Sequence, residues 1–174
     1  RDKTELILLG SRGLSNIRAF LLGSVSQQVA THAPCSVFVV KHGGAAVKRF
    51  LLAVDGSRAA EAAMRFLPAH FAPGRLRGAA LYAWDYPLHP RPESLPLQMV
   101  EERYCRPLRR AGFPTVPRLA RGHAAARIIE AVRRERPDLV VIGSRGLTGP
   151  TRLLLGGVSH KVVKYSSRSV LVVR

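Results

Sequence analysis

The most regular feature of the sequence is a short apolar run that ends in glycine. Residues 139–142 (LVVI) lead directly into residues 143–146 (GSRG), and residues 169–173 form a second apolar run. A continuous apolar run of this length, bounded by turn residues, indicates a strand buried on both faces. Such strands are typical of parallel sheets that helices cover on both sides. Residues 139–174 therefore predict a strand, a glycine loop, a helix and a second strand.

The same pattern occurs earlier in the chain. Residues 6–41 align with residues 139–174 at a constant offset of 133 without a gap, and 16 of the 36 positions are identical. The period exceeds the roughly 20–50 residues of solenoid repeats, so the repeated unit is a whole domain. Residues 48–174 then hold one complete unit, residues 1–41 the carboxyl-terminal third of another, and residues 42–47 the linker. We expect the chain to be a fragment or processed form of a tandem protein.

Strand-like apolar runs alternate with helical periodicity through the complete unit. This alternation predicts a doubly wound α/β fold with a parallel sheet, helices on both faces and right-handed crossovers. The proline-rich residues 85–97 are predicted to form an irregular loop. The other predicted strands are residues 5–9, 36–40, 49–54, 78–84 and 116–120, and the predicted helices are residues 17–31, 59–67, 99–111 and 124–135.

The formal net charge of +17 raises the question of a polyanion partner. Residues 48–174 hold 23 of the 28 Lys and Arg and 9 of the 11 acidic residues, a net +14. These basic residues are scattered, without a long basic run and with few interleaved aromatics, whereas single-strand binders combine a basic groove with aromatic stacking. We interpret the charge as solvated arginine-rich faces that favour small anionic ligands, and nucleic-acid binding stays as an alternative.

The cysteines, the histidines and Asp55 bear on which functions are compatible with the sequence. Cys35 and Cys105 need no role beyond that of thiols in a reducing cytoplasm. The six histidines show no metal-ligand spacing, and no apolar stretch has transmembrane length. Asp55, after the first strand of the complete unit, has no assignable base or second carboxylate beside it. We therefore expect a cytoplasmic protein without a metal site or a membrane span, and not an enzyme.

The glycines of the complete unit follow the spacing Gly143-x2-Gly146-x9-Gly156-Gly157-x-Ser159. Glycine lets backbone N–H groups approach an anion closely, and a helix amino terminus adds unpaired donors and partial positive charge. This chemistry suits phosphate oxygens, although tight turns in a packed α/β fold would explain the glycines equally well. The spacing is neither that of a Walker loop nor that of the dinucleotide fingerprint.

Together, residues 53–57 (AVDGS), the glycine spacing and the closing strand resemble the universal stress protein family. The resemblance covers the complete unit from end to end, and residues 5–41 resemble the last third of a second copy. It implies a Rossmann-like, five-stranded doubly wound sheet of strand order 3-2-1-4-5. It also implies homodimers, or intramolecular pseudo-dimers, that form by pairing of the last strands, here residues 37–40 and 170–173.

The resemblance also implies a site for ATP, with or without Mg²⁺. Asp55 and the hydrophobic position Ala83 would hold ribose and adenine. The phosphates would lie on the glycine loop and the helix start. Gly157 departs from the family's Ser or Thr, which removes one neutral hydrogen bond worth about 1 kcal/mol and leaves the backbone N–H. The implied phosphate residues are Gly143, Gly146, Gly156, Gly157, Val158 and Ser159, while Arg12 and Arg145, inside the two loops, face either phosphate or solvent.

The first copy shows the reverse situation. It retains the full phosphate sequence, including Ser24 at the position of Gly157, but its adenine-binding half would lie before Arg1. This second site is therefore predicted to be incomplete in the chain as given. Its residues are Gly10, Gly13, Gly23, Ser24, Val25 and Ser26.

Three functions remain open on this basis. The first is a stress-response or regulatory module that binds ATP or a related adenine nucleotide without efficient catalysis, slow ATP hydrolysis being left open. The second is a non-nucleotide dimerisation or interaction module, in which the glycine loop is structural. The third is polyanion binding through the basic surface.

Overall fold

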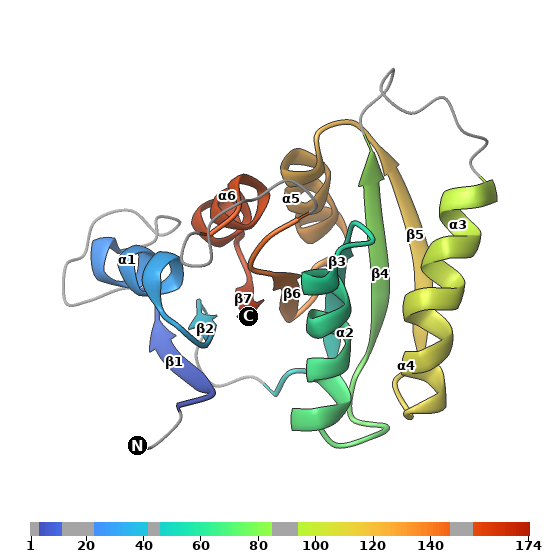
Figure 1. Cartoon of the computed structure of the whole chain (residues 1–174), viewed down its shortest axis with the longest axis horizontal. Coiled ribbons are helices and arrows are strands. Elements are labelled where there is room, and N and C mark those ends of the chain that lie inside the picture. Colours follow the sequence, from blue (N-terminus) through green and yellow to red (C-terminus); the bar gives the residue numbers. More distant parts are fainter. Residues whose placement is uncertain (1–3, 12–22, 42–45, 85–93, 147–154) are drawn as a thin grey trace.

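The computed structural model describes residues 4–11, 23–41, 46–84, 94–146 and 155–174. Its strands form one seven-stranded sheet of order β1-β2-β7-β6-β3-β4-β5 (Figure 1). The strands are β1 (Leu6–Gly10), β2 (Ser36–Val40), β3 (Arg49–Val54), β4 (Arg77–Trp84), β5 (Thr115–Arg121), β6 (Leu139–Gly143) and β7 (Ser169–Val173). The helices are α1 (Ser24–His32), α2 (Arg58–His70), α3 (Ser94–Val100), the π-helix η1 (Glu101–Cys105), α4 (Arg106–Arg110), α5 (Ala124–Glu135) and α6 (Gly157–Tyr165).

The sheet is larger than the five strands predicted for the complete unit. Strands β7, β6, β3, β4 and β5 are parallel neighbours, and β2 adds to β7 in the antiparallel direction. β1 follows β2 as a parallel edge strand. The end of an open sheet presents unpaired backbone groups, and β2 satisfies those of β7. The predicted pairing of residues 37–40 with residues 170–173 is thereby confirmed.

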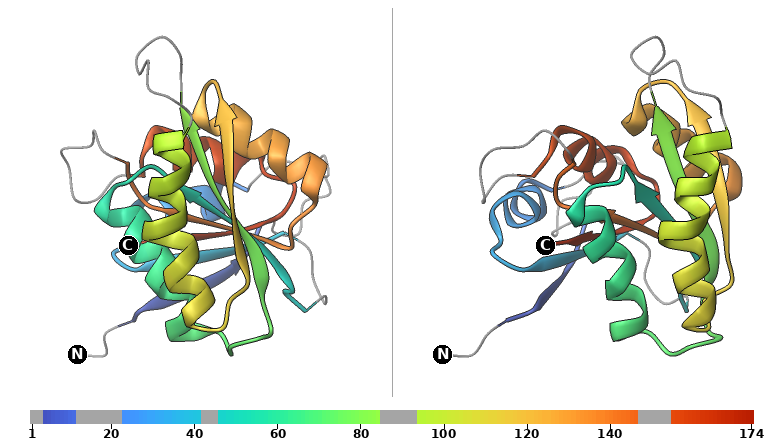
Figure 2. Two further views of the ribbon diagram at one scale, coloured as in Figure 1. Left: turned by 90° about the vertical axis from the view of Figure 1, so that its right-hand side faces the viewer. Right: turned by 45° about the vertical axis from the view of Figure 1, so that its right-hand side comes forward.

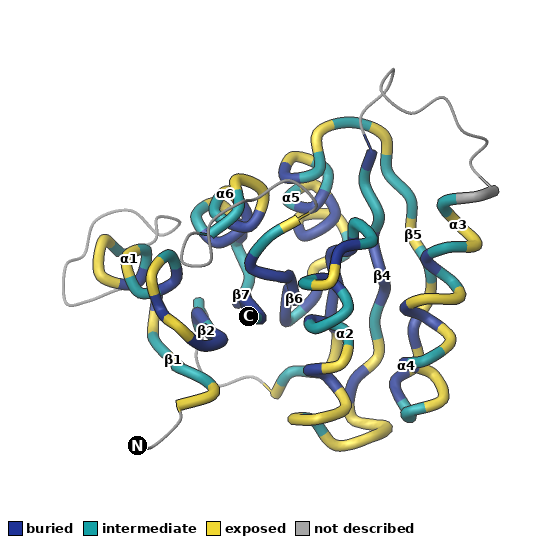
Figure 3. Tube along the Cα trace, in the orientation of Figure 1, coloured by how far each residue is buried: buried dark blue, intermediate teal, exposed yellow. Residues whose placement is uncertain are grey.

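Helices cover both faces of this sheet, as Figure 2 shows. Leu51 and Ala53 of β3 pack into the core on the side of α5 and α6. The intervening Phe50 and Leu52 pack into the core on the side of α2 and α4. Figure 3 shows burial concentrated on β6 and its neighbours, while β1 is intermediate to exposed and the outer side of α1 is exposed. The continuous apolar runs of the sequence are therefore strands buried on both faces.

The two repeats are joined by hydrogen bonds that are equivalent in both directions. Phe38 lies opposite Leu171, its own repeat equivalent, so the β2–β7 pairing is centred on this position. The backbone N–H of Lys41 donates to Ser169 Oγ at 3.1 Å, and that of Arg174 donates to Ser36 Oγ at 3.3 Å. Such reciprocity is what an isologous contact between two like surfaces produces.

The side chains of Lys41 and Arg174 each bind the helix of the other repeat. Each follows the last strand of its own repeat and donates to carbonyls at the carboxyl end of the other repeat's helix, α6 for Lys41 and α1 for Arg174. Cations at this end satisfy unpaired carbonyls and complement the helix dipole. The bonds run from Lys41 Nζ to Val163 O and Ser166 O, both at 2.7 Å, and from Arg174 Nη2 to Ala30 O at 2.9 Å and Thr31 O at 3.0 Å.

Three predicted helix boundaries were wrong. α2 continues through Pro68 to His70, because a proline in the last turn costs a single backbone donor. α1 begins at Ser24, with Gly23 extended at φ −64° and ψ 151°, and Val25, expected on its apolar face, is 73% exposed. α3 begins at Ser94, inside the segment predicted to be a loop. Residues 85–93 and 12–22 lie outside the described residues.

The predicted helix over residues 99–111 is interrupted by a π-turn. The Arg106 N–H donates to Glu101 O, five residues back, and Pro107 follows directly. Proline cannot donate, and its ring clashes with the carbonyl four residues earlier, so the wider turn relieves the clash. The predicted inward residues Val100, Tyr104 and Leu108 are nevertheless all buried.

Candidate functional site

Asp55 stands at the carboxyl end of β3, where a tight turn leads into α2. Its Oδ1 accepts a hydrogen bond from the Ser57 N–H at 2.9 Å, and Gly56 between them has φ +85°. Ser57 Oγ in turn accepts from the Ala60 N–H at 3.1 Å and caps α2. An aspartate that bonds two residues ahead stabilises such a turn. Asp55 is half-buried, and the bond from the Ser57 N–H fixes the orientation of its carboxylate.

The glycine loop after β6 lies directly against this carboxylate. A Cβ atom on Gly146 would come within 2.5 Å of Asp55 Oδ2, and a Cβ on Gly143 would come within 2.7 Å of the Ala59 backbone. The backbone contact requires glycine at position 143, whereas a side chain at position 146 would have to displace the Asp55 carboxylate. β3 and β6 are parallel neighbours, so the ends of both strands meet at one edge of the sheet, where ligands bind in such folds. The structure thus brings together the two predicted halves of the site.

Hydrogen bonds fasten the glycine loop to α6. The Gly156 N–H donates to Ser144 O at 2.8 Å, and Ser159 Oγ donates to Gly143 O at 2.7 Å. Ser159 is 3% exposed. The Ser159 hydroxyl donates its proton to Gly143 O and so stabilises the loop. Towards a ligand, its oxygen could then act only as a hydrogen-bond acceptor.

Among the described residues, none covers the amino end of α6 at Gly157. Gly156 is its N-cap, without a side-chain hydrogen bond, and the first turn contains no acidic residue. Gly157 and Val158 are exposed there. A Cβ on Gly157 would meet no described residue within 4 Å, so the described part of the chain gives no steric reason for glycine at this position. The first N–H groups of a helix have no partner within it and attract phosphate oxygens.

Ala83 comes next to Asp55 across the sheet. The β3–β4 pairing ends at Val54 opposite Tyr82, so Asp55 and Ala83 are the following residues of adjacent strands. Ala83 is half-buried, whereas its neighbour Trp84 is 8% exposed and stacks with Tyr82 at 6.1 Å between ring centroids. Ala83 thus lies on the strand next to Asp55, at the same end of the sheet.

Residues 6–41 show the same hydrogen bonds as residues 139–174. Ser26 Oγ donates to Gly10 O at 2.7 Å, and the Gly23 N–H donates to Ser11 O at 2.9 Å. Ser24 and Val25 are exposed at the start of α1, as Gly157 and Val158 are at the start of α6. Gly13 lies outside the described residues.

Two residues near the site were not assigned to it from the sequence. Arg103 Nη1 would lie 3.7 Å from a Cβ on Gly56, and its guanidinium pairs with Glu61 of α2, which lowers the pKa of that carboxyl. Tyr104 is fully buried, and burial raises the pKa of its hydroxyl. The helical periodicity indicated that Tyr104 points inward. No local pattern placed Arg103 beside the turn, because the contact joins η1 to the end of β3.

Other potential reactive groups lie apart or in the core. Cys35 and Cys105 are free and buried, and burial raises the pKa of the Cys105 thiol to about 11. The described residues contain no group of three His, Cys, Asp or Glu side chains that could hold a metal ion. None of the described helices combines the length and apolar character needed to cross a membrane.

The sequence matches a known family over nearly its whole length. The model of the universal stress protein family matches residues 1–41 and 46–174. The chain belongs to this family. A universal stress protein of Mycolicibacterium smegmatis is 32% identical over 98% of this chain and 62% of its own length. Universal stress protein Rv2623 of Mycobacterium tuberculosis is 28% identical over 97% of this chain and 61% of its own length. The chain thus spans about three fifths of the length of these universal stress proteins.

Solved universal stress protein structures share the fold. The protein from Archaeoglobus fulgidus gives a TM-score of 0.70 with 22% identity, over 98% of this chain and 62% of that one. A family protein from Arabidopsis thaliana with AMP bound gives 0.56 with 20% identity, over 72% and 90%. A universal stress protein in complex with cAMP gives 0.58 with 20% identity, over 75% and 99%. At these identities the likeness concerns the α/β architecture.

Proposed function

We propose that this protein is a stress-response or regulatory module that binds ATP, or a related adenine nucleotide, through residues 48–174 and does not catalyse efficiently. The observation that carries the proposal is the contact of Gly146 with the Asp55 carboxylate, which joins the two halves of the site. Two structural neighbours hold AMP and cAMP, which supports an adenine nucleotide as the ligand class.

Each part of the nucleotide has a matching group. The Asp55 carboxylate accepts hydrogen bonds from ribose hydroxyls, and such bonds to a charged acceptor are the stronger kind. The open amino end of α6 receives the phosphates, and Ala83 provides the apolar contact for adenine. Asp55 is the carboxylate that the described residues place beside the loop, and the proposal assigns it to the ribose. Mg²⁺, where present, would therefore be bound mainly by the phosphate oxygens.

The absence of efficient turnover is part of the same proposal. The hydrogen bond that Asp55 makes within the described residues is to a backbone N–H, and this bond holds the carboxylate in the turn rather than in contact with a histidine. A general base needs a position within hydrogen-bond reach of the attacking water and a pKa suited to taking its proton. Incubation with ATP, followed by chromatography of ADP and AMP, measures any slow hydrolysis.

We further propose that β1, α1 and β2 are the last third of a second unit, so that β2 and β7 join two units as an intramolecular pseudo-dimer. The gapless repeat, the equivalent hydrogen bonds of Ser26 and Ser159, and the reciprocal contacts of Lys41 and Arg174 support this. A cytoplasmic location is proposed with it.

The decisive test is Asp55→Asn. The change removes the charge at constant size, and the amide oxygen can still accept from the Ser57 N–H. Isothermal titration calorimetry should show ATP affinity at least about tenfold weaker, the size expected for a hydrogen bond to a charged group. Glu102→Gln, which neutralises an exposed carboxylate on η1, is the matched control and should bind as the unmodified protein does. Equal affinities in all three proteins would contradict the proposal.

A non-nucleotide interaction module is the second candidate. It is favoured by Ser159, whose hydroxyl proton is already used within the loop, and by Gly157. Thermal-shift measurements with ATP, AMP and a short DNA duplex separate the possibilities. Stabilisation by a nucleotide supports the leading proposal, no stabilisation supports the interaction module, and salt-sensitive stabilisation by DNA supports polyanion binding.

A further inference from the structure

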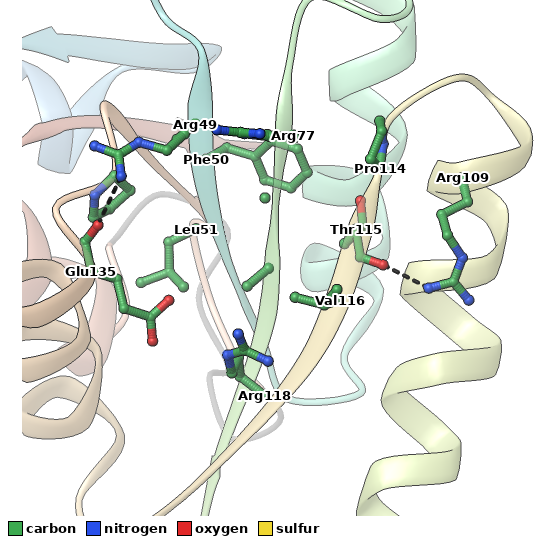
Figure 4. Close-up of a pocket in the computed structure, with 13 residues that line it drawn as sticks. Arg49, Phe50, Leu51, Arg77, Arg109, Pro114, Thr115, Val116, Arg118 and Glu135 are labelled. Carbon is green, nitrogen blue, oxygen red and sulfur yellow. Dashed lines mark hydrogen bonds between the residues drawn. The ribbon is translucent and has the colours of Figure 1, made fainter.

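A cavity of about 430 Å³ lies at the opposite edge of the sheet from Asp55 (Figure 4). It is formed where β3, β4 and β5 begin, with Arg49, Arg77 and Thr115 as the first residues of these strands. Asp55 follows the other end of β3. Cavities of this volume commonly hold small molecules. This cavity is therefore separate from the proposed nucleotide site, and a ligand could bind in it whether or not a nucleotide binds at Asp55.

The floor of the cavity is apolar because of the strand register. Leu51, Ala79 and Val116 lie side by side on β3, β4 and β5 and form one row across the sheet. Ala79 has a smaller side chain than Leu51 and Val116, so the row is recessed at its middle position. α5 packs over the sheet further along the strands and ends at Glu135. Leu51 and Ala79 are 1% and 5% exposed, whereas Val116 is 44% exposed, so the accessible apolar surface of the row lies at Val116. The result is a flat apolar strip at the edge of the sheet.

Cationic side chains stand on both sides of this strip. Arg49 and Arg77 are direct register partners, two residues before Leu51 and Ala79. Arg118 lies two residues beyond Val116, opposite Leu81. Figure 4 shows Arg49 and Arg77 at one end of the cavity and Arg118 at the other. Since side chains two residues apart on a strand point to the same face, the three arginines border one apolar strip.

These arginines differ in how many hydrogen-bond partners they have within the protein. Arg49 donates to Glu135 O at 3.3 Å and Arg136 O at 2.7 Å, which ties it to the end of α5. Arg77 makes no side-chain hydrogen bond or ion pair with any described residue, and Arg118 donates only to the neighbouring Pro117 O at 3.3 Å. Glu135, the acid among the residues that line the cavity, pairs with Arg134 at 3.2 Å.

Arg49 and Arg77 are like charges held opposite each other in the sheet, so they repel. A bound anion would relieve this repulsion. We infer that this cavity is a second ligand site, for a small, flat, apolar monoanion whose body lies over Val116, the exposed end of the row, and whose anionic group pairs with Arg77 or Arg118. The apolar strip selects against fully hydrated ions such as inorganic phosphate. The arginines select against neutral apolar molecules.

Fluorescence titration with anilinonaphthalene sulfonate tests this inference, because the dye is an aromatic monoanion that brightens on an apolar surface. One saturable site is expected. The neutral analogue N-phenyl-1-naphthylamine, which has the same aromatic body, should bind at least about tenfold more weakly. The double variant Arg77→Gln, Arg118→Gln should weaken dye binding to a similar extent, while Arg133→Gln, on an exposed part of α5 outside the cavity, should leave it unchanged.

Val116→Glu is the second variant, since it places a negative charge on the exposed strip without changing the arginines. This variant should abolish saturable dye binding, with an unchanged circular dichroism spectrum. Added AMP should not displace the dye. The inference is overturned if no saturable binding occurs at millimolar dye, if AMP displaces the dye, if the neutral analogue binds equally well, or if Arg133→Gln weakens binding as much as the cavity variants.

Discussion

Gly157 is the residue at which this chain departs most clearly from the sequence expected for a phosphate loop. The structure places it at the first position of α6, exposed and with open space around its Cα. Glycine at this position is therefore not needed for packing, in contrast to Gly146, which has the Asp55 carboxylate against it. The two glycines look alike in the sequence and differ entirely in what a side chain would meet.

Gly157→Ser should strengthen nucleotide binding about fivefold, because one neutral hydrogen bond is worth about 1 kcal/mol. Gly157→Ala is the matched control, since it adds the Cβ and the helix propensity without the hydroxyl. Calorimetric titration with ATP measures both. Equal affinities of the Ser and Ala variants would show that the hydroxyl adds nothing.

The strand–loop–helix element is held together by its own hydrogen bonds. Ser159 and Ser26 make the same 2.7 Å bond to the glycine at the end of the preceding strand. Both serines are nearly buried, so loss of the hydroxyl leaves a carbonyl oxygen without its partner. This fastening keeps the helix start beside the strand end whether or not a ligand is bound.

Ser159→Ala should lower the free energy of unfolding by about 1–3 kcal/mol, the cost of an unsatisfied buried acceptor. Urea unfolding followed by circular dichroism measures it. Ser167→Ala, at a half-buried position in the turn between α6 and β7, is the control and should change stability by less than about 0.5 kcal/mol. If Ser159→Ala behaves like this control, the bond does not hold the loop.

At the scale of the whole molecule, β2 and β7 make one sheet out of the two repeats. The reciprocal contacts of Lys41 and Arg174 with the helix ends reinforce this joint. The charged groups of Lys41 and Arg174 are thereby partly removed from water. Burial lowers the pKa of Lys41 from its usual 10.5 to about 8, and burial followed by the nearby Arg145 lowers the pKa of Arg174.

The Lys41 shift predicts a pH dependence of stability. Between pH 8 and pH 10.5 the unfolded chain keeps the Lys41 proton and the folded chain has lost it, so the free energy of unfolding rises with pH in this window. The slope from one group is at most about 1.4 kcal/mol per pH unit. The rise should be visible as the difference between the unmodified protein and Lys41→Met in urea unfolding at several pH values. Lys161→Met, at an exposed position on α6, should show no such difference.

Most of the secondary structure followed from local pattern. The strands over residues 36–40, 49–54 and 169–173 and the helix over residues 124–135 begin and end as predicted. Their signals are continuous apolar runs, helical periodicity and glycine or proline at the boundaries. The errors occur where a longer-range effect competes with the local signal: Pro68 and Pro107 are accommodated by the helices around them, and Val25 faces solvent because Ser26 and Ala30 form the buried side of α1.

The strands, the glycine loops, the repeat and the family could all be read from the amino-acid sequence, because each depends on the order and spacing of neighbouring residues. The contact of Gly146 with Asp55, the exchange of Lys41 and Arg174 between the repeats, and the arginine-bordered cavity became visible only in the folded molecule. These features join residues that are distant along the chain. Their geometry depends on strand order and register, which the packing of the whole sheet establishes.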